Sequence, residues 1–202
     1  MTVVYPVGRG LYVNLTNRCP CACRFCIRQN GEGVYGSASL WLEREPTAEE
    51  VVAAIGAADP ASYDEVVFCG YGEPTERLDV LLEVARRIRE TSPKMPIRVN
   101  TNGLGDLIAG APTAARFKGL VDTVSISLNA PTAEEYFRVC RPKFGLGSYE
   151  AMLRFAAEAK DAVPSVVFTV VGTEDMTEEK VAACRAVCDR IGVPLRVRTY
   201  AR

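Results

Sequence analysis

The amino-acid sequence predicts an α/β domain built on six parallel strands. Short apolar runs rich in Val, Ile and Phe alternate with amphipathic stretches over the 202 residues, and this alternation is typical of right-handed βαβ units. No internal repeat, low-complexity tract or linker divides the chain, so we expect residues 1–202 to form one domain. Six strands are too few for a closed eight-stranded barrel; they fit either an open doubly wound sheet or an incomplete barrel.

The expected strands are apolar runs of strand length, rich in β-branched side chains. In chain order they are Leu11–Thr16, Glu65–Cys69, Ile97–Thr101, Thr123–Leu128, Ser165–Val171 and Leu195–Thr199. Loops that follow parallel strands gather at the carboxyl edge of the sheet. We therefore expect the chemistry of the protein at that edge.

The intervening helices carry start and stop signals. Thr47 with Glu50, and Thr132 with Glu135, have the spacing of capping boxes. Asp79–Arg89 is amphipathic, with an apolar face made of Leu78, Leu81, Leu82, Ala85 and Ile88. Three further helices are expected: one from Ser148 to Ala159, one from Thr177 to a stop at Gly192 and Pro194, and a shorter, irregular one within Leu104–Lys118.

The composition disfavours several classes of partner. The formal net charge is −1, which gives no indication of a surface for nucleic acid or membrane. No apolar run is long enough to span a bilayer, and Met1–Gly10 lacks the features of a signal peptide. We therefore expect a cytoplasmic protein with no nucleic-acid or membrane partner.

The sequence has eight cysteines and no histidine. In a reducing compartment, clustered cysteines indicate metal or redox chemistry before disulfides. The lack of histidine excludes every His-ligated metal site and removes the commonest acid–base side chain. Any proton transfer must therefore use Asp, Glu, Lys, Tyr or Cys.

A cysteine loop, Cys19-Pro-Cys-Ala-Cys-Arg-Phe-Cys26, directly follows the first expected strand. Thiolates are the usual ligands of iron–sulfur clusters. The spacing of Cys19, Cys23 and Cys26 allows one tight loop to bind three irons of a cubane 4Fe-4S cluster. The fourth iron would then be open to a non-protein ligand.

Cys21 leaves a second interpretation open. With Cys21 included, the loop offers four thiolates, Cys19, Cys21, Cys23 and Cys26, which could close around a structural zinc ion. Structural zinc loops usually pair two separated CxxC-like halves, and the sequence has no second half with that spacing. A cluster with an open iron is therefore favoured.

The pattern Cys19-x3-Cys23-x2-Cys26 after a first strand, with Phe25 before the last cysteine, resembles the signature of radical SAM enzymes. The resemblance implies a partial (βα)6 barrel without a C-terminal extension, in which the three cysteines hold a 4Fe-4S cluster. It also implies that the open iron binds S-adenosylmethionine, which one electron cleaves to a 5′-deoxyadenosyl radical. The protein then supplies orientation and shielding to the chemistry of its cofactor.

Later strands carry further similarities to this family, in the family's order. The second strand ends in Cys69-Gly70-Tyr71-Gly72-Glu73-Pro74, which is similar to the Gly-Gly-Glu-Pro motif that contacts the methionine amino group, although Tyr71 separates the two glycines. Glycines at a strand end let main-chain groups approach a ligand closely. A simple strand-to-helix turn is the alternative reading.

The next three strands continue the similarity. Asn100-Thr101-Asn102-Gly103 resembles the Thr-Asn-Gly motif, and Ser127 resembles the serine that bonds the ribose or carboxylate of the cofactor. The strand that contains Val170 is similar to the one that packs on adenine. The resemblance thus implies a cofactor site made of Phe25, Gly70, Gly72, Glu73, Asn100, Asn102, Ser127, Asn129, Val170 and Arg198.

Longer phrases are similar to the TatD-associated radical SAM group. They cover nearly the whole chain and comprise Leu15–Cys19, Leu40–Pro46, Phe68–Thr75, Asn100–Leu104, Ser125–Pro131 and Cys140–Pro142. This resemblance implies an association with a TatD-like hydrolase. It implies no particular reaction.

Strand alternation predicts which side chains face the barrel interior. Val99, Leu195 and Val197 are expected to face outward onto helices. The inward set is polar and consists of Tyr12, Asn14, Thr16, Arg98, Asn100, Asn102, Ser125, Ser127, Asn129, Arg196, Arg198 and Tyr200.

Three of these inward side chains are arginines: Arg98, Arg196 and Arg198. Arginine suits bidentate recognition of carboxylate or phosphate, so they are expected to bind an anionic substrate or the carboxylate of the cofactor. Ion pairing with Glu65, Glu73 or Asp122 at the base of the barrel is an equally good alternative.

Two loops are candidate lids that would keep water from a radical, Ile27–Arg44 and Arg138–Gly147. Ordinary surface loops are the default reading of both. Among the remaining cysteines, Cys184 and Cys188 share a helical face and could join Cys140 in an auxiliary site, but core packing is favoured. Cys69, next to the glycine motif, is either a hydrogen-atom donor or a packing residue.

The favoured function is a radical enzyme that acts on a small substrate, anionic if the arginines bind it, and that takes electrons from a protein such as flavodoxin or ferredoxin. In this respect it resembles compact 7-carboxy-7-deazaguanine synthases. One alternative resembles activating enzymes that act on a glycyl-radical partner protein. A non-catalytic zinc or iron–sulfur structural module is the alternative from a different class.

Overall fold

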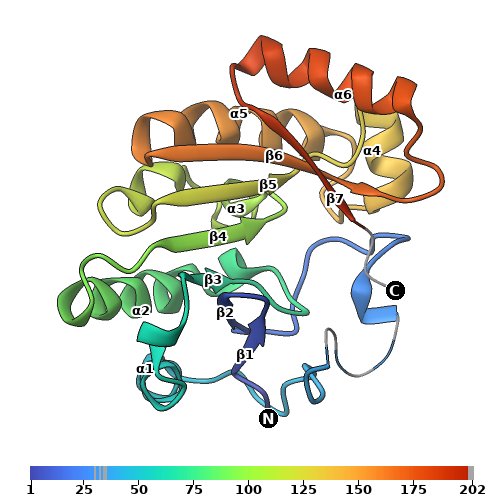
Figure 1. The fold of residues 1–202 in the computed structure, drawn as a ribbon. Helices are drawn as coiled ribbons and strands as arrows, with labels where there is room; N and C mark the ends of the chain where they lie inside the picture. The colour runs from blue at the N-terminus through green and yellow to red at the C-terminus, as the bar shows by residue number, and fades with distance from the viewer. Residues whose placement is uncertain (30, 32, 34–35, 200–202) are drawn as a thin grey trace.

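Seven strands form one curled sheet in the computed structural model, which describes residues 1–199 other than 30, 32, 34 and 35 (Figure 1). The strands are β1 (Val4–Val7), β2 (Gly10–Val13), β3 (Glu65–Phe68), β4 (Ile97–Thr101), β5 (Thr123–Ser127), β6 (Ser165–Gly172) and β7 (Leu195–Thr199). They lie side by side in chain order, antiparallel between β1 and β2 and parallel from there on. A doubly wound sheet reverses its strand order at a switch point, and this sheet does not. The predicted incomplete barrel is thus confirmed, and the doubly wound alternative is wrong.

In the described part of the chain, six α-helices connect the parallel strands and lie along the outer side of the sheet (Figure 1). They are α1 (Ala48–Ala57), α2 (Leu78–Thr91), α3 (Gly105–Ala109), α4 (Ala133–Cys140), α5 (Gly147–Ala162) and α6 (Glu178–Ile191). Four short 3₁₀ helices occur as well: η1 (Ile27–Gln29), η2 (Pro60–Ser62), η3 (Pro74–Arg77) and η4 (Ala114–Phe117). The irregular helix expected between residues 104 and 118 is therefore two separate short helices, α3 and η4.

The helix caps follow from the sequence signals. Thr47 and Glu50 form both hydrogen bonds of a capping box at α1. At α4 the Thr132 side chain accepts a hydrogen bond from the main-chain N–H of Glu135. The Glu135 carboxylate pairs with Arg138 at 3.5 Å. The glutamate of the second expected capping box therefore has a different partner from the one predicted. Helix α6 ends at Gly192, whose φ of 71° is the left-handed conformation that glycine adopts without strain.

Strand β1 is an element that the sequence analysis did not predict. It pairs with β2 through a tight turn at Gly8, whose φ is +58°. Pro6 in its centre has no N–H to donate, which is tolerated because β1 is an edge strand. The hairpin brings the rings of Tyr5 and Tyr12 to 5.6 Å and so adds an aromatic wall at the start of the sheet.

The core lies between the outer face of the sheet and the helices. Alternate residues of the central strands, such as Val99 on β4 and Val124 and Ile126 on β5, are completely buried there. The outward prediction for Val99 is thus confirmed. Val197 on β7 was expected to pack on helices but is 45% exposed, because β7 is the other edge of the sheet. None of the helices in the described residues is long and apolar enough to cross a membrane.

One matched pair of substitutions tests this core. Val124→Ala removes two methyl groups from a fully buried site, and Val197→Ala removes the same groups from the exposed edge. We expect Val124→Ala to lower the free energy of unfolding by about 2 kcal/mol and Val197→Ala to change it by about 0.5 kcal/mol or less. Urea denaturation followed by circular dichroism measures both. Equal losses would contradict the described burial.

Candidate active site

The chain between β2 and the cysteine loop (Cys19–Cys26) is held by side-chain hydrogen bonds. Thr16 Oγ1 donates to Glu45 Oε1 at 2.6 Å. The Asn17 side chain donates to the carbonyl of Leu42 at 2.8 Å and accepts the N–H of Leu42 at 3.0 Å. The entry to the loop therefore has a fixed position beside the carboxyl ends of β2 and β3.

Contacts around Leu42 and Leu40 correct part of the first lid hypothesis, in which Ile27–Arg44 closes over the site. Residues Leu40 and Leu42 of the expected lid Ile27–Arg44 are buried, and Asn14 donates to the carbonyl of Leu40 at 2.7 Å. This end of the loop is thus anchored to the sheet. Asn30, Glu32, Val34 and Tyr35, in the middle of the expected lid, lie outside the described residues.

The second expected lid, Arg138–Gly147, is paired with the cysteine loop over part of its length, and its role as a lid stays a prediction. Its residues 139–143, which we call the clamp segment, pair through the main chain with the cysteine loop. Ala22 N donates to Cys140 O at 3.1 Å, Arg24 N to Val139 O at 2.9 Å, and Lys143 N to Pro20 O at 2.8 Å, and an isolated bridge joins Cys21 to Pro142. The clamp segment therefore fixes the first half of the cysteine loop.

This pairing gathers four sulfur atoms with different proton affinities. Hydrogen bonding to the Cys21 thiol lowers the pKa of Cys19, and hydrogen bonds from Cys140 and Cys21 lower the pKa of Cys23 to about 4. The same interactions, together with burial, raise the pKa of Cys21 and of Cys140 far above the usual range. Cys19 and Cys23 are thus shifted toward thiolates, the form that binds metals, and Cys21 and Cys140 toward neutral thiols.

A cavity of about 210 Å³ lies over the carboxyl ends of the strands and contains the predicted site residues. It is lined by Cys19, Cys23, Cys26, Phe25, Gly70, Gly72, Glu73, Asn100, Asn102, Ser127, Asn129 and Arg198. These residues come from the cysteine loop and from the ends of β3, β4, β5 and β7. Segments that are distant in sequence therefore meet in one place.

Val170 is the exception among the predicted site residues. It is fully buried in the hydrophobic core, and the neighbouring Val171 lines the cavity instead. Because successive side chains of a strand point to opposite faces, the predicted register of β6 at the cavity was wrong by one residue.

Glu73 is buried at the centre of the cavity wall. Its carboxylate accepts hydrogen bonds from Thr75 N at 3.1 Å, Thr75 Oγ1 at 2.8 Å, Thr101 Oγ1 at 2.7 Å and Asn102 N at 2.8 Å. Burial raises the pKa of Glu73, and the hydrogen bonds from Thr101, Asn102 and Thr75 act in the opposite direction. The carboxyl group is thus fixed in orientation at the junction of β3 and β4.

Two glycines make this junction possible. A Cβ on Gly70 would lie 2.1 Å from Asn14 Oδ1, and a Cβ on Gly72 would lie 2.2 Å from the carbonyl oxygen of Thr16. Both distances are far below van der Waals contact. The strand end that bears Glu73 can therefore pack against the chain leading into the cysteine loop only because it lacks side chains there.

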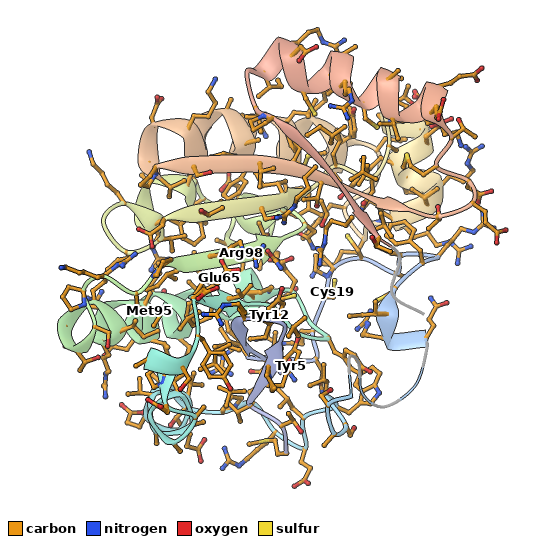
Figure 2. The ribbon with its side chains drawn as sticks, in the orientation of Figure 1. Tyr5, Tyr12, Cys19, Glu65, Met95 and Arg98 are labelled. Atoms are coloured by element: carbon orange, nitrogen blue, oxygen red, sulfur yellow. The ribbon has the colours of Figure 1, made fainter. Side chains whose placement is uncertain are left out.

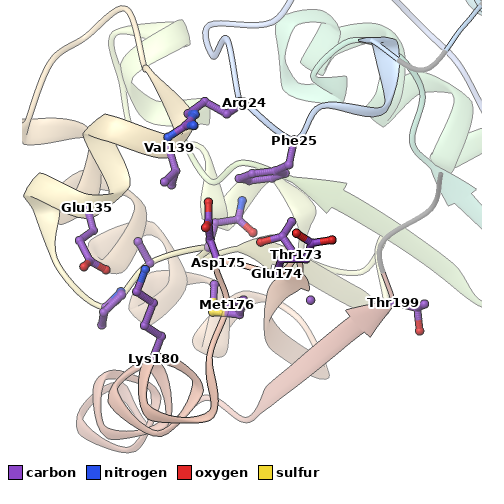
Figure 3. Close-up of a pocket in the computed structure, with 14 residues that line it drawn as sticks. Arg24, Phe25, Glu135, Val139, Thr173, Glu174, Asp175, Met176, Lys180 and Thr199 are labelled. Atoms are coloured by element: carbon purple, nitrogen blue, oxygen red, sulfur yellow. The ribbon is translucent and has the colours of Figure 1, made fainter.

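A second, larger cavity of about 490 Å³ adjoins the first (Figure 3). The two share Phe25, Asn129 and Thr199. In Figure 3, Arg24 and Phe25 of the cysteine loop lie across from Thr173, Glu174 and Asp175, which follow β6, while Lys180 reaches in from α6. The two cavities together form one continuous opening over the ends of β5, β6 and β7.

Several lining residues were missed by the sequence analysis. Tyr5, Ile27, Thr101, Tyr136 and Cys140 border the smaller cavity. Tyr5 belongs to the unpredicted hairpin, and Cys140 is placed by the clamp segment, so neither position has a local sequence signal. Cys140 is also buried, as are Cys184 and Cys188, and those two lie in the hydrophobic core as predicted.

The interior arginines divide between the two predicted roles. Arg98 pairs with Glu65 at 2.5 Å, which is the structural alternative. Asp122 pairs with Arg89 of α2 at 2.5 Å, and Glu73 is held as described above, so neither is the partner of an interior arginine. Arg198 lines the cavity. The remaining inward prediction, Tyr200, lies outside the described residues.

The chain was also compared with known proteins. The family model of the radical SAM superfamily matches residues 13–186. A curated relative, a GTP 3′,8-cyclase of Rhodococcus opacus (strain B4), is 32% identical over 196 residues, which cover 94% of this chain and 50% of the relative. This chain thus spans about half the length of that relative.

Solved structures show a similar fold at low sequence identity. Streptococcus suis SuiB bound to its precursor peptide SuiA superposes with a TM-score of 0.69 at 16% identity, over 98% of this chain and 40% of SuiB. A radical SAM methyltransferase from Sphaerobacter thermophilus superposes with a TM-score of 0.65 at 19% identity, over 97% of this chain and 68% of that protein. At these identities the likeness concerns the fold alone.

A glycine pair tests the close packing at the site. Gly72→Ala places a methyl group against main-chain oxygens of Thr16 and Arg18, whereas Gly56→Ala on α1 has open space around it. We expect Gly72→Ala to lower the free energy of unfolding of the apoprotein by about 2 kcal/mol or more. Gly56→Ala is expected to leave it unchanged or raise it by about 0.5–1 kcal/mol. Urea unfolding curves check both, and a harmless Gly72→Ala would contradict the described packing.

Proposed function

Because the chain belongs to the radical SAM superfamily, we propose that Cys19, Cys23 and Cys26 hold its 4Fe-4S cluster beside a binding site for S-adenosylmethionine. Radical SAM enzymes use both groups. The observation that supports this placement is the cavity at the carboxyl edge of the sheet, which brings the three cysteines together with the ends of β3, β4, β5 and β7. When bound, the cluster supplies the electron that cleaves S-adenosylmethionine to a 5′-deoxyadenosyl radical.

The donor set fits a cluster with one open iron. The three cysteines line the cavity, and the shift of Cys19 and Cys23 toward thiolates provides the ligand form that iron requires. Cys21 is shifted the other way, toward a neutral thiol. Cys21 also lines the cavity, so the assignment of three ligands rests on the Cys19-x3-Cys23-x2-Cys26 spacing.

The zinc-knuckle alternative has less support. A single tetrahedral zinc ion requires its thiolates to converge on one point. Among the described residues, no group of three or more cysteine, aspartate or glutamate side chains is placed to hold a metal ion in this way. A cubane distributes its ligands over separate irons and does not need such convergence.

A buried polar atom without a hydrogen-bond partner supports a position for the rest of the cofactor. Within the described residues, Asn129 Oδ1 is buried and accepts no hydrogen bond, although Asn129 borders both cavities. Buried polar groups are nearly always paired. We propose that Asn129 and Ser127 contact the adenosyl part of S-adenosylmethionine, with Phe25 beside it.

The methionine part is assigned to the opposite wall. Gly70 and Gly72 expose the main chain of the β3 end to the cavity, and Glu73 is fixed there by its hydrogen bonds. Asn102 lies next to them and approaches the sulfur of Cys19 at 3.9 Å. These residues orient the cofactor and keep water away from it. Asn100 and Arg198, the other two predicted cofactor residues, lie with Cys69 in the same cavity and are considered in the next subsection.

We further propose a small-molecule substrate and a protein reductant such as flavodoxin or ferredoxin. The named relative is a GTP 3′,8-cyclase, which supports a phosphate-bearing substrate; because this chain spans about half of that relative, its reaction is not transferred here. The phrases similar to the TatD-associated group support a second proposal, an association with a TatD-like hydrolase. We also propose that residues 1–202 make one radical SAM core.

Cysteine substitutions test the ligand set. We expect Cys19→Ala, Cys23→Ala and Cys26→Ala each to lower the iron content of anaerobically reconstituted protein by about half or more, because three ligands are the minimum for a site-differentiated cluster. Cys21→Ala is expected to keep the iron content of the unaltered protein. Iron and zinc analysis with visible absorbance measures this. Loss of metal in Cys21→Ala, with zinc replacing iron in the unaltered protein, would instead support the closed zinc site.

A serine pair tests the cofactor contact. Ser127 lines the cavity, whereas Ser125, two residues earlier on β5, is buried below it. We expect Ser127→Ala to weaken binding of S-adenosylmethionine by about fivefold, the effect of one hydrogen bond. Ser125→Ala is expected to change it by less than about twofold. Equilibrium binding to the cluster-loaded protein checks this, and equal effects of the two variants would exclude the assigned contact.

A further inference from the structure

The interior arginines, Arg98, Arg196 and Arg198, share a space with a single carboxylate. Figure 2 shows Arg98 grouped with Glu65 and Tyr12 on neighbouring strands β4, β3 and β2. Arg98 donates to Glu65 at 2.5 Å and to the Tyr12 hydroxyl at 3.5 Å. Glu65 is therefore already engaged by one of the three guanidinium groups.

Arg196 and Arg198 have no carboxylate partner among the described residues. Partial burial and the positive charges of Arg98 and Arg198 lower the pKa of Arg196. Guanidinium groups stay protonated in proteins. Arg196 is exposed to solvent and the charge of Glu65 also acts on it, whereas Arg198 is half-buried and lines the smaller cavity.

Unsatisfied polar atoms lie in the same region. Asn100 is 9% exposed, and both its amide oxygen and its amide nitrogen lack a hydrogen-bond partner among the described residues. Arg98 Nε is buried without a partner as well. Leaving such groups unpaired costs about 1–3 kcal/mol each. A ligand with several oxygen atoms would satisfy the donors of Asn100 and of the arginines together.

The wall opposite β7 is aromatic. Tyr5 and Tyr12 line it with Tyr71 and Cys69. Glu73 lines the same cavity as Arg198, but its carboxylate is already held by Thr75, Thr101 and Asn102. Although β2 and β7 are far apart in the sheet order, Tyr12 of β2 and Arg198 of β7 line the same cavity as Cys69. The curl of the sheet therefore closes a compartment with cationic groups on one side and flat aromatic rings on the other.

We propose that Arg198 and Arg196, with the amide of Asn100, bind the carboxylate or phosphate group of a small substrate whose flat, less polar part lies against Tyr5 and Tyr12. This substrate class rests on the proposed function, in which the cluster and S-adenosylmethionine occupy the upper part of the same opening. Planar guanidinium forks match the two oxygens of a carboxylate or phosphate. Arg198 and Asn100 line the same cavity as Ser127 and Asn129.

The test uses cluster-loaded protein saturated with S-adenosylmethionine and simple anions as probes. Inorganic phosphate and benzoate are titrated calorimetrically, with benzamide as the uncharged analogue of benzoate. Arg198→Gln and Arg196→Gln remove one charge each from the proposed site. Arg185→Gln removes one charge from the exposed face of α6 and is the matched control. Arg198→Lys keeps the positive charge but loses the planar guanidinium group that can bind two oxygens at once.

We expect one of the two anions to bind to the unaltered protein and benzamide not to bind. Arg198→Gln is expected to weaken anion binding at least tenfold and Arg196→Gln about threefold, with partial recovery in Arg198→Lys and no change in Arg185→Gln. The affinity for S-adenosylmethionine is expected to stay within twofold in all four variants. Preference for phosphate or for benzoate identifies which oxyanion the site takes.

Three results would overturn this proposal. The first is that neither anion binds to the unaltered protein. The second is that Arg185→Gln weakens anion binding as much as Arg198→Gln does. The third is that Arg198→Gln weakens binding of S-adenosylmethionine and leaves anion binding unchanged, which would assign this arginine to the cofactor carboxylate. Failure of the proposed function has a separate signature: protein that takes up no iron and no S-adenosylmethionine. If such protein still bound the anion through Arg198, the anion site would be supported and the proposed function would not.

Discussion

The buried carboxylate of Glu73 organises the site. Its two oxygens accept four hydrogen bonds from Thr75, Thr101 and Asn102, and its main-chain N–H donates to the carbonyl of Arg18 at 2.8 Å. One residue thus joins the ends of β3 and β4 to the chain that enters the cysteine loop. A buried carboxylate is stable only if its acceptors are filled, so the positions of these three segments depend on one another.

The smaller cavity combines groups of different chemistry. The thiols of the cysteine loop, the polar ends of β3, β4 and β5, and the guanidinium group of Arg198 all line it. Radical SAM enzymes use an iron–sulfur cluster and S-adenosylmethionine. If both are bound beside the cysteine loop as proposed, Arg198 is the cationic group of the cavity that would be left to act on a substrate.

Much of this arrangement follows from the sequence, because strand periodicity is a local signal. The alternation of Ser125, Ser127 and Asn129, and the position of the cysteine loop after the first parallel strand, placed the cavity correctly. Val170 was misplaced because β6, in which Thr169 stands between apolar neighbours, gives little alternation to fix its register. Strand β1 was missed because Pro6 reads as a strand breaker, and only an edge position tolerates it.

The pairing of the cysteine loop with the clamp segment had no signal in the sequence. It consists of main-chain hydrogen bonds between residues 20–24 and 139–143, and main-chain groups are the same in every residue. Arg141, which starts the turn after α4, has a φ of +46°. Few non-glycine residues adopt this conformation, and the sequence Cys140-Arg141-Pro142 does not predict it. The placement of Cys140 beside Cys23 was therefore visible only in three dimensions.

This main-chain pairing changes what metal insertion has to accomplish. Fixing the backbone of one residue costs about 1–2 kcal/mol of conformational entropy. In small metal-dependent domains, folding and metal binding occur together, so this entropy loss lowers the affinity for the metal. Here residues 20–24 are ordered by the polypeptide itself. The cysteine loop is thus held in place by main-chain hydrogen bonds, and a metal group bound by its thiols as proposed would meet an ordered segment rather than a chain that has to fold around it.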